Sequence, residues 1–270
     1  MQSKWEFLDG LTLAPIIMKQ YLISLVTRLK NYSESLDNIA LFQDKTWTFF
    51  DKDNSVIRYI FRANKELIIS KNGIANIAKW DYISSSKFLL IKTDTQNLLL
   101  NQNYVDNGAM ILQTDGSNDK FILMDENIIP DLNLEKYLKK VFYKKYNVKF
   151  VKLNDGVILE IVNGLNKENY YGLECLVDTI PISNGYYQDT SSGRAFRIEN
   201  SRVSRVTVPK LYNTRDGREI VIDQLQFNSI SIGDFVFDTE LKPVLNDKYS
   251  ISFFKSIYVE DGCITKISGI

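Results

Sequence analysis

The placement of the glycines is the feature of this sequence that most constrains the fold. Nine of the thirteen glycines directly follow Asn or Asp. Asn-Gly and Asp-Gly pairs supply the positive φ angles that two-residue β-hairpin turns require. Most of these pairs are flanked by β-branched and aromatic residues, as in ELIISKNGIANIAKW around Asn72-Gly73. The pattern predicts a mainly β protein (all-β or α+β) built from antiparallel hairpins rather than βαβ units.

Two segments have the apolar spacing of helices instead. The second, NLEKYLKKV, carries apolar residues from Leu134 to Val141 at helical intervals, with Asn133 as its predicted N-cap. The sequence between the two helices predicts about eight strands, from Trp47 to about Met124. The first helix is predicted from Leu13 to about Lys30, and its apolar face consists of Ala14, Met18, Leu22, Leu25 and Leu29. This face needs a cover, either the inner side of the predicted strands or a partner chain, and we expect the first of these.

An internal repeat occupies the last part of the chain. At an offset of 61 residues, Asp155-Gly156 matches Asp216-Gly217, and Gly172 matches Gly233. The offset persists at the far end, where Glu199 matches Glu260. We interpret the two copies, residues 148–208 and 209–270, as a duplicated small β domain whose copies support each other, because units of ~60 residues are near the lower limit of independent stability.

These observations predict three parts in the chain. Residues 1–130 form an N-terminal helix plus an antiparallel meander or half-barrel. Residues 131–147 form a linking helix. Residues 148–270 form the duplicated β domain.

The N-terminal strands also carry a family resemblance. Across residues 47–91, aromatic and turn landmarks follow in the order Trp47, Tyr59 with Phe61, Asn72-Gly73, and Trp80. This order resembles the opening of lipocalin-like β-meander domains found in bacterial proteins. The resemblance implies a meander or half-barrel with at most a pocket for an apolar ligand. The predicted ligand-binding residues are then Trp47, Tyr59, Phe61 and Trp80.

Composition removes several classes of function. The chain has no histidine, which excludes Ser-His-Asp and Cys-His catalysis and histidine-ligated zinc. Its two cysteines, Cys175 and Cys263, cannot make a four-thiolate site. We therefore expect no metal or cofactor, and no catalytic residue is assigned. Lys+Arg and Asp+Glu both number 33, so we expect no nucleic-acid partner. Charged residues interrupt the most apolar stretch, Leu11–Leu29, so we expect no membrane span.

The first functional hypothesis is a non-enzymatic interaction or assembly protein of bacterial type. Its partner would be another protein or a second copy of the chain. The first residues show no secretory signal, and two cysteines without a disulfide framework are typical of the cytoplasm. Three alternatives stay open: a β-barrel that binds a small apolar ligand, a carboxylate-dependent glycan-active enzyme, and a toxin, immunity or secreted cargo protein.

Overall fold

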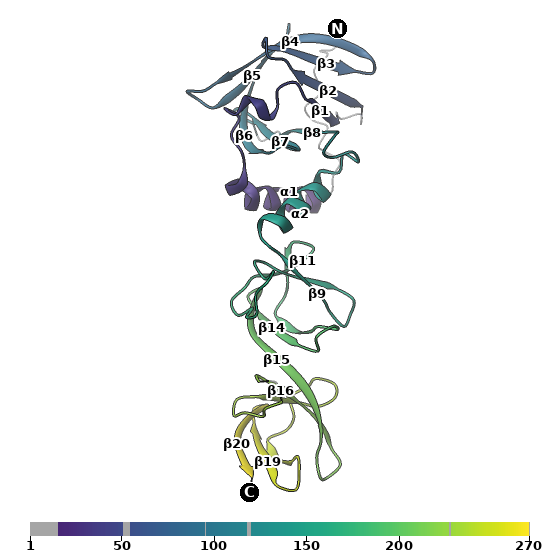
Figure 1. Ribbon diagram of the computed structural model, residues 1–270, viewed down its shortest axis with the longest axis vertical. Coiled ribbons are helices and arrows are strands. Elements are labelled where there is room, and N and C mark those ends of the chain that lie inside the picture. Colours follow the sequence, from purple (N-terminus) through teal and green to yellow (C-terminus); the bar gives the residue numbers. More distant parts are fainter. Residues whose placement is uncertain (1–15, 51–54, 95, 118–119, 227, 270) are drawn as a thin grey trace. The chain divides into compact units, whose positions relative to one another are not determined.

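The computed structural model describes residues 16–50, 55–94, 96–117, 120–226 and 228–269, with side chains in the first helix described from residue 21 onward. The chain divides into two compact units, Met1–Lys145 and Tyr146–Ile270. Both units are built mainly from antiparallel strands (Figure 1), which confirms the predicted mainly β class.

Unit 1 contains a closed barrel of eight strands. The strands follow the chain order around the barrel, and β1 pairs with β8 to close it. Asn72-Gly73 forms the β3–β4 turn with φ angles of 52° and 78°, as the hairpin pattern predicts. The strands are β1 (Thr46–Phe50), β2 (Val56–Phe61), β3 (Glu66–Lys71), β4 (Ile74–Ile83), β5 (Phe88–Lys92), β6 (Asn97–Val105), β7 (Ala109–Thr114) and β8 (Lys120–Asp125).

One end of the barrel interior is filled by the segment that precedes β1. This segment includes the short 3-10 helices η2 (Lys30–Tyr32) and η3 (Ile39–Leu41). Phe42 follows η3, is fully buried, and contacts Phe61 and Trp80 edge-to-face at 5.3 and 5.4 Å between ring centroids. The indole N–H of Trp47 donates a 3.0 Å hydrogen bond to the carbonyl oxygen of Phe42. The plug therefore consists of Leu36, Leu41 and Phe42, which belong to the barrel core.

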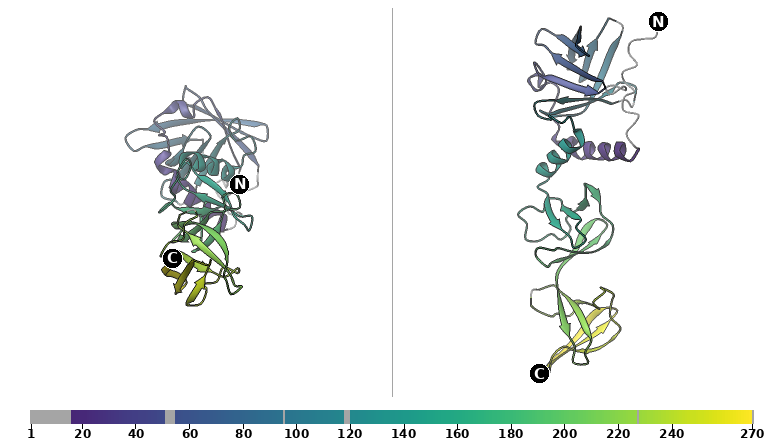
Figure 2. Two further views of the ribbon diagram at one scale, coloured as in Figure 1. Left: turned by 60° about the horizontal axis from the view of Figure 1, so that its bottom comes forward. Right: turned by 90° about the vertical axis from the view of Figure 1, so that its right-hand side faces the viewer.

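The first helix does not have the role that the sequence predicts for it. Helix α1 (Ile16–Leu29) packs against helix α2 (Leu134–Lys145) and β6, and among its described side chains none belongs to the barrel core. Figures 1 and 2 show both helices outside the barrel wall. Leu25 and Leu29, two residues of the predicted apolar face, are nevertheless buried. Ala14 and the side chain of Met18 lie outside the described residues.

Helix α2 belongs to unit 1. Asn133 caps it, since its side-chain oxygen accepts a 2.9 Å hydrogen bond from the Lys136 N–H. Tyr137 donates a 2.8 Å hydrogen bond to Asp106, the residue that orders the turn between β6 and β7. The helix assigned to a linker in the sequence analysis therefore packs onto the barrel unit.

Unit 2 consists of short strands in a four-stranded and an eight-stranded sheet. Strand β15 is shared, because its first half pairs with β14 and its second half with β16 (Figure 1). The strands are β9 (Lys149–Lys152), β10 (Ile158–Ile161), β11 (Cys175–Val177), β12 (Ile180–Pro181), β13 (Gly185–Gln188), β14 (Ala195–Glu199), β15 (Arg202–Asn213), β16 (Glu219–Gln224), β17 (Phe235–Phe237), β18 (Asp247–Ser250), β19 (Lys255–Glu260) and β20 (Cys263–Gly269).

The two copies of the repeat make equivalent bonds 61 residues apart. The N–H of Gly172 donates to the carbonyl oxygen of Val203, and the N–H of Gly233 donates to that of Ile264, both at 2.8 Å. Both glycines have positive φ, at 75° and 88°. Each copy has its own core, and six matched positions are buried in both: Leu159/Ile220, Ile161/Ile222, Cys175/Val236, Phe196/Ile257, Ile198/Val259 and Val203/Ile264.

Candidate functional site: the cavity of the barrel

The barrel of unit 1 contains a cavity of about 280 Å³ that is partly open to solvent. Its position follows from the side-chain alternation of β2, in which Ile57, Tyr59 and Phe61 share the inward face. Phe61 contacts the plug residue Phe42, whereas Ile57 and Tyr59 line the cavity. The plug therefore fills one end of the interior and the cavity occupies the other. Its apolar lining consists of Phe49, Ile57, Tyr59, Ile69, Ile91, Leu98 and Phe121, with Ile74 at the turn.

Three aromatic rings form one part of the cavity wall. Phe49 on β1, Tyr59 on β2 and Phe121 on β8 are mutual neighbours, with centroid separations of 5.1 to 5.5 Å. Their planes are tilted or perpendicular to one another, the arrangement that aromatic quadrupoles favour. Because β1 and β8 close the barrel, this cluster lies on both sides of the closing seam.

The hydroxyl group of Tyr59 is a polar group in this otherwise apolar aromatic wall. Tyr59 is only 6% exposed, and burial raises the pKa of its phenol above the ordinary value. No residue that the structure describes forms a hydrogen bond with this hydroxyl. The oxygen is accessible from the cavity, because it is not among the fully buried side-chain atoms that lack a hydrogen-bond partner. The apolar wall of the cavity therefore carries one hydroxyl group that can still form a hydrogen bond with a ligand.

Polar residues line the cavity near two strand connections. Asn72 and Asn76 come from the β3–β4 hairpin, and Thr93 and Gln96 come from the segment between β5 and β6. Lys71, at the end of β3, lines the same region. A molecule in the cavity would meet apolar side chains inside and amide or hydroxyl groups near these connections.

The structure brings one of the four predicted ligand-binding residues to the cavity. Tyr59 lines it. Trp47, Phe61 and Trp80 are almost completely buried around the plug and are not part of the lining. The sequence reasoning missed Phe49 and Phe121, although both occur in strand-like runs of aromatic and β-branched residues, TWTFF and KFILMD. Ligand binding by the four residues stays a prediction.

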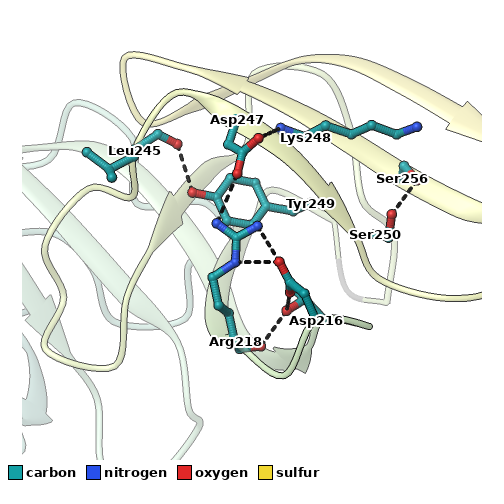
Figure 3. Close-up of polar contacts among 9 residues, drawn as sticks. Asp216, Arg218, Leu245, Asp247, Lys248, Tyr249, Ser250 and Ser256 are labelled. Carbon is teal, nitrogen blue, oxygen red and sulfur yellow. Dashed lines mark hydrogen bonds and ion pairs between the residues drawn. The ribbon is translucent and has the colours of Figure 1, made fainter.

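A second cluster of charged residues surrounds Arg218 in unit 2 (Figure 3). The pKa values of its carboxyl groups are shifted, but its contacts serve to hold the fold together. The Arg218 guanidinium donates to Asp216 at 2.8 and 2.6 Å and to Asp247 at 3.0 Å, and lies 4.4 Å from the ring centroid of Tyr249. Hydrogen bonds from Arg218 and Thr214 lower the pKa of Asp216 to about 2. The guanidinium thus joins the β15–β16 turn to β18, and its donors are already directed at these two carboxylates.

Within the described ranges, no three His, Cys, Asp or Glu side chains gather in a way that could hold a metal ion. Cys175 is completely buried, and burial raises the pKa of its thiol to about 12. Among the helices that the structure describes, none has both the length and the apolar character needed to cross a membrane. Comparison with known proteins finds no matching family model, no matching curated protein and no matching solved structure.

Proposed function

We propose that unit 1 is a binding module for a small apolar molecule that carries one hydrogen-bonding group. The observation that carries this proposal is the Tyr59 hydroxyl, which lies at an apolar cavity and has no hydrogen-bond partner in the described chain. A ligand oxygen would supply the missing hydrogen bond and would displace apolar surface from water at the same time. The proposal needs no catalytic group.

The cavity volume sets the size of the ligand. An engineered apolar cavity of ~150 Å³ accepts benzene, which has six heavy atoms. By that ratio, the 280 Å³ cavity accepts a molecule of roughly eleven heavy atoms. The volume is also close to the lower end, ~300 Å³, of ordinary small-molecule sites.

The barrel topology supports the same proposal. Eight antiparallel strands in chain order, closed by the first and last strand, form an up-and-down barrel. Barrels of this kind with eight strands have room for one small ligand. The resemblance of residues 47–91 to lipocalin-like domains implies the same activity, and it remains part of the proposal.

The test compares two probes that differ by one hydroxyl, naphthalene and 2-naphthol. Both match the expected size. We expect the full chain to bind both, and we expect Tyr59→Phe to weaken 2-naphthol about 3- to 10-fold while leaving naphthalene unchanged. The same substitution leaves the free energy of unfolding nearly unchanged, because the hydroxyl has no protein partner to lose.

Tyr82→Phe is the matched control, since Tyr82 on β4 packs against the barrel core but does not line the cavity. It leaves both affinities unchanged. Failure of the full chain to bind 2-naphthol at about 1 mM contradicts the proposal. Equal losses for the two probes in Tyr59→Phe contradict the role of the hydroxyl.

Binding of another protein or of a second copy is the second candidate function. Exposed apolar side chains in unit 2 favour it: Phe253 and Phe254, in the connection between β18 and β19, are 78% and 67% exposed.

The proposed compartment is the cytoplasm, which is supported by two cysteines that form no disulfide.

A further inference from the structure

Unit 2 contains a groove of about 690 Å³ between the two copies of the repeat. One side comes from β13, β14 and the turn after β14, and the other from β16, β17 and the turn between β19 and β20. None of these elements belongs to the barrel, so the groove is independent of the cavity described above. Its volume lies within the ~300–1,000 Å³ range of small-molecule sites.

Aromatic rings form part of the groove lining. Tyr186 on β13 and Phe237 on β17 come from different copies, and their ring centroids are 5.7 Å apart. Phe235 is stacked against Phe237 at 6.2 Å. All three side chains are only half-buried. Partly exposed aromatic faces offer negative π surfaces to the C–H groups of a ligand.

Hydrogen-bonding groups of both kinds accompany the rings. Asp223 is 2% exposed, accepts a 3.0 Å hydrogen bond from the Tyr186 hydroxyl, and still lines the groove. The other carboxylates that line it are Glu199 and Asp261. The Arg197 guanidinium and the amides of Asn184 and Asn200 supply donors.

The charges of the lining argue against an ionic ligand. One arginine, Arg197, faces three acidic residues, and it is already paired with Glu199 at 3.1 Å. An anionic ligand would therefore meet net repulsion. A cation would compete for the Phe235 ring with the guanidinium groups of Arg197 and Arg205, which lie 4.8 and 4.6 Å from its centroid. A neutral ligand fits the groove best.

The repeat provides an internal comparison for these residues. The buried core positions are apolar in both copies, so the scaffold requires them. At the positions of copy 1 that match Phe235, Phe237 and Asp223, the chain has Glu174, Leu176 and Val162 instead. The scaffold therefore does not itself require aromatic rings or a carboxylate at these three positions.

The cross-strand pair Tyr186–Arg197 also has a counterpart in copy 2. In copy 2, Lys248 on β18 pairs with Tyr258 on β19. The positively charged residue therefore takes the place of Tyr186, and the aromatic residue takes the place of Arg197. Tyr258 is half-buried like Tyr186 but does not line the groove. It therefore offers a matched control at the equivalent place in the fold.

We infer that this groove binds a neutral oligosaccharide. Sugar rings have C–H faces that pack on aromatic side chains, and their hydroxyls both donate and accept hydrogen bonds. Tyr186 and Phe237 would contact the ring faces, and Asp223, Asp261 and Asn184 would bind hydroxyl groups. The site has the size for two or three sugar units, judged from its volume of about 690 Å³.

The test applies the full chain to an array of linear neutral oligosaccharides of glucose, galactose, mannose and N-acetylglucosamine, with heparin as a polyanion. The affinity of the best binder is then measured by calorimetry. We expect binding to at least one neutral oligosaccharide. We also expect Tyr186→Ala and Phe237→Ala to weaken it at least about tenfold, and Tyr258→Ala to leave it unchanged.

Tyr186→Ala also removes a hydrogen-bond donor to the buried Asp223, so it changes the fold as well as the groove. Asp261→Asn is therefore a second variant, which preserves the shape of the side chain. Asp261 lies in an exposed turn, and its loss weakens binding at least about threefold. An array without neutral binders, or with heparin as its only ligand, overturns the inference. Equal losses in Tyr258→Ala and Tyr186→Ala overturn the location of the site.

Discussion

The plug that closes one end of the barrel makes a strong prediction about Phe42. Its side chain is completely buried and contacts Phe61 and Trp80 edge-to-face at 5.3 and 5.4 Å. Replacing a buried Phe by Ala costs about 3–5 kcal/mol. The two aromatic contacts, each worth ~0.5–1.5 kcal/mol beyond area burial, place Phe42→Ala in the upper half of that range, at about 4–5 kcal/mol. The Trp47 hydrogen bond to the backbone of residue 42 can persist.

The assay is urea unfolding followed by tryptophan fluorescence. Unit 2 contains no tryptophan, because Trp5, Trp47 and Trp80 all precede residue 146, so the signal does not report unfolding of unit 2. We expect a lower unfolding midpoint in Phe42→Ala. The control is Ile77→Ala on β4 of unit 1, where the side chain is 68% exposed, and its effect stays within about 0.5 kcal/mol. A loss below about 1 kcal/mol in Phe42→Ala refutes the plug.

Two further predictions concern unit 2. Hydrogen bonds from Arg218 and Thr214 lower the pKa of Asp216, and hydrogen bonds from the Lys248 N–H and from Arg218 lower the pKa of Asp247. The stability from these carboxylates is therefore present above about pH 4 and is lost as the pH falls toward 2. Tyrosine circular dichroism during acid unfolding will show a smaller loss over this range in Arg218→Gln than in the unchanged chain, and equal losses would rule out the ion pairs. If Phe253 and Phe254 mediate self-association, replacing both by Ser lowers the mass measured by light scattering, whereas Tyr171→Ser, which alters another exposed ring, does not. An unchanged mass in the double variant contradicts self-association through this connection.

The local signals in the sequence predicted the strands well. The Asn72-Gly73 pair adopts the two positive φ angles of a hairpin turn, and Asn133 caps α2. These features depend on a few neighbouring residues, so they can be seen in the sequence. The match between Gly172 and Gly233 is similar in kind, since both glycines have positive φ and donate to equivalent carbonyl groups.

The tertiary partners could not be predicted in the same way. The spacing of the apolar residues in α1 showed that one face of this helix must be buried. It did not show whether that face packs into the barrel interior or against α2. Phe42 fills the interior because the segment after α1 turns back to β1, and no periodic pattern marks such a segment. The side chain of Trp80 faces the barrel interior, as those of the cavity residues do, but it contacts the plug residue Phe42. The groove depends on how residues such as Tyr186 and Phe237 meet across the two copies, which no local motif shows.

We propose that the barrel cavity of unit 1 holds a small apolar molecule, and isoleucine-methyl NMR is the decisive test of this proposal. The full chain is labelled at its isoleucine methyl groups and titrated with 2-naphthol. The account predicts shifts for Ile57, Ile69 and Ile91, which line the cavity, and none for Ile161 and Ile222 in the cores of unit 2. Shifts that spare the three cavity isoleucines, or that appear equally in both units, contradict the claim.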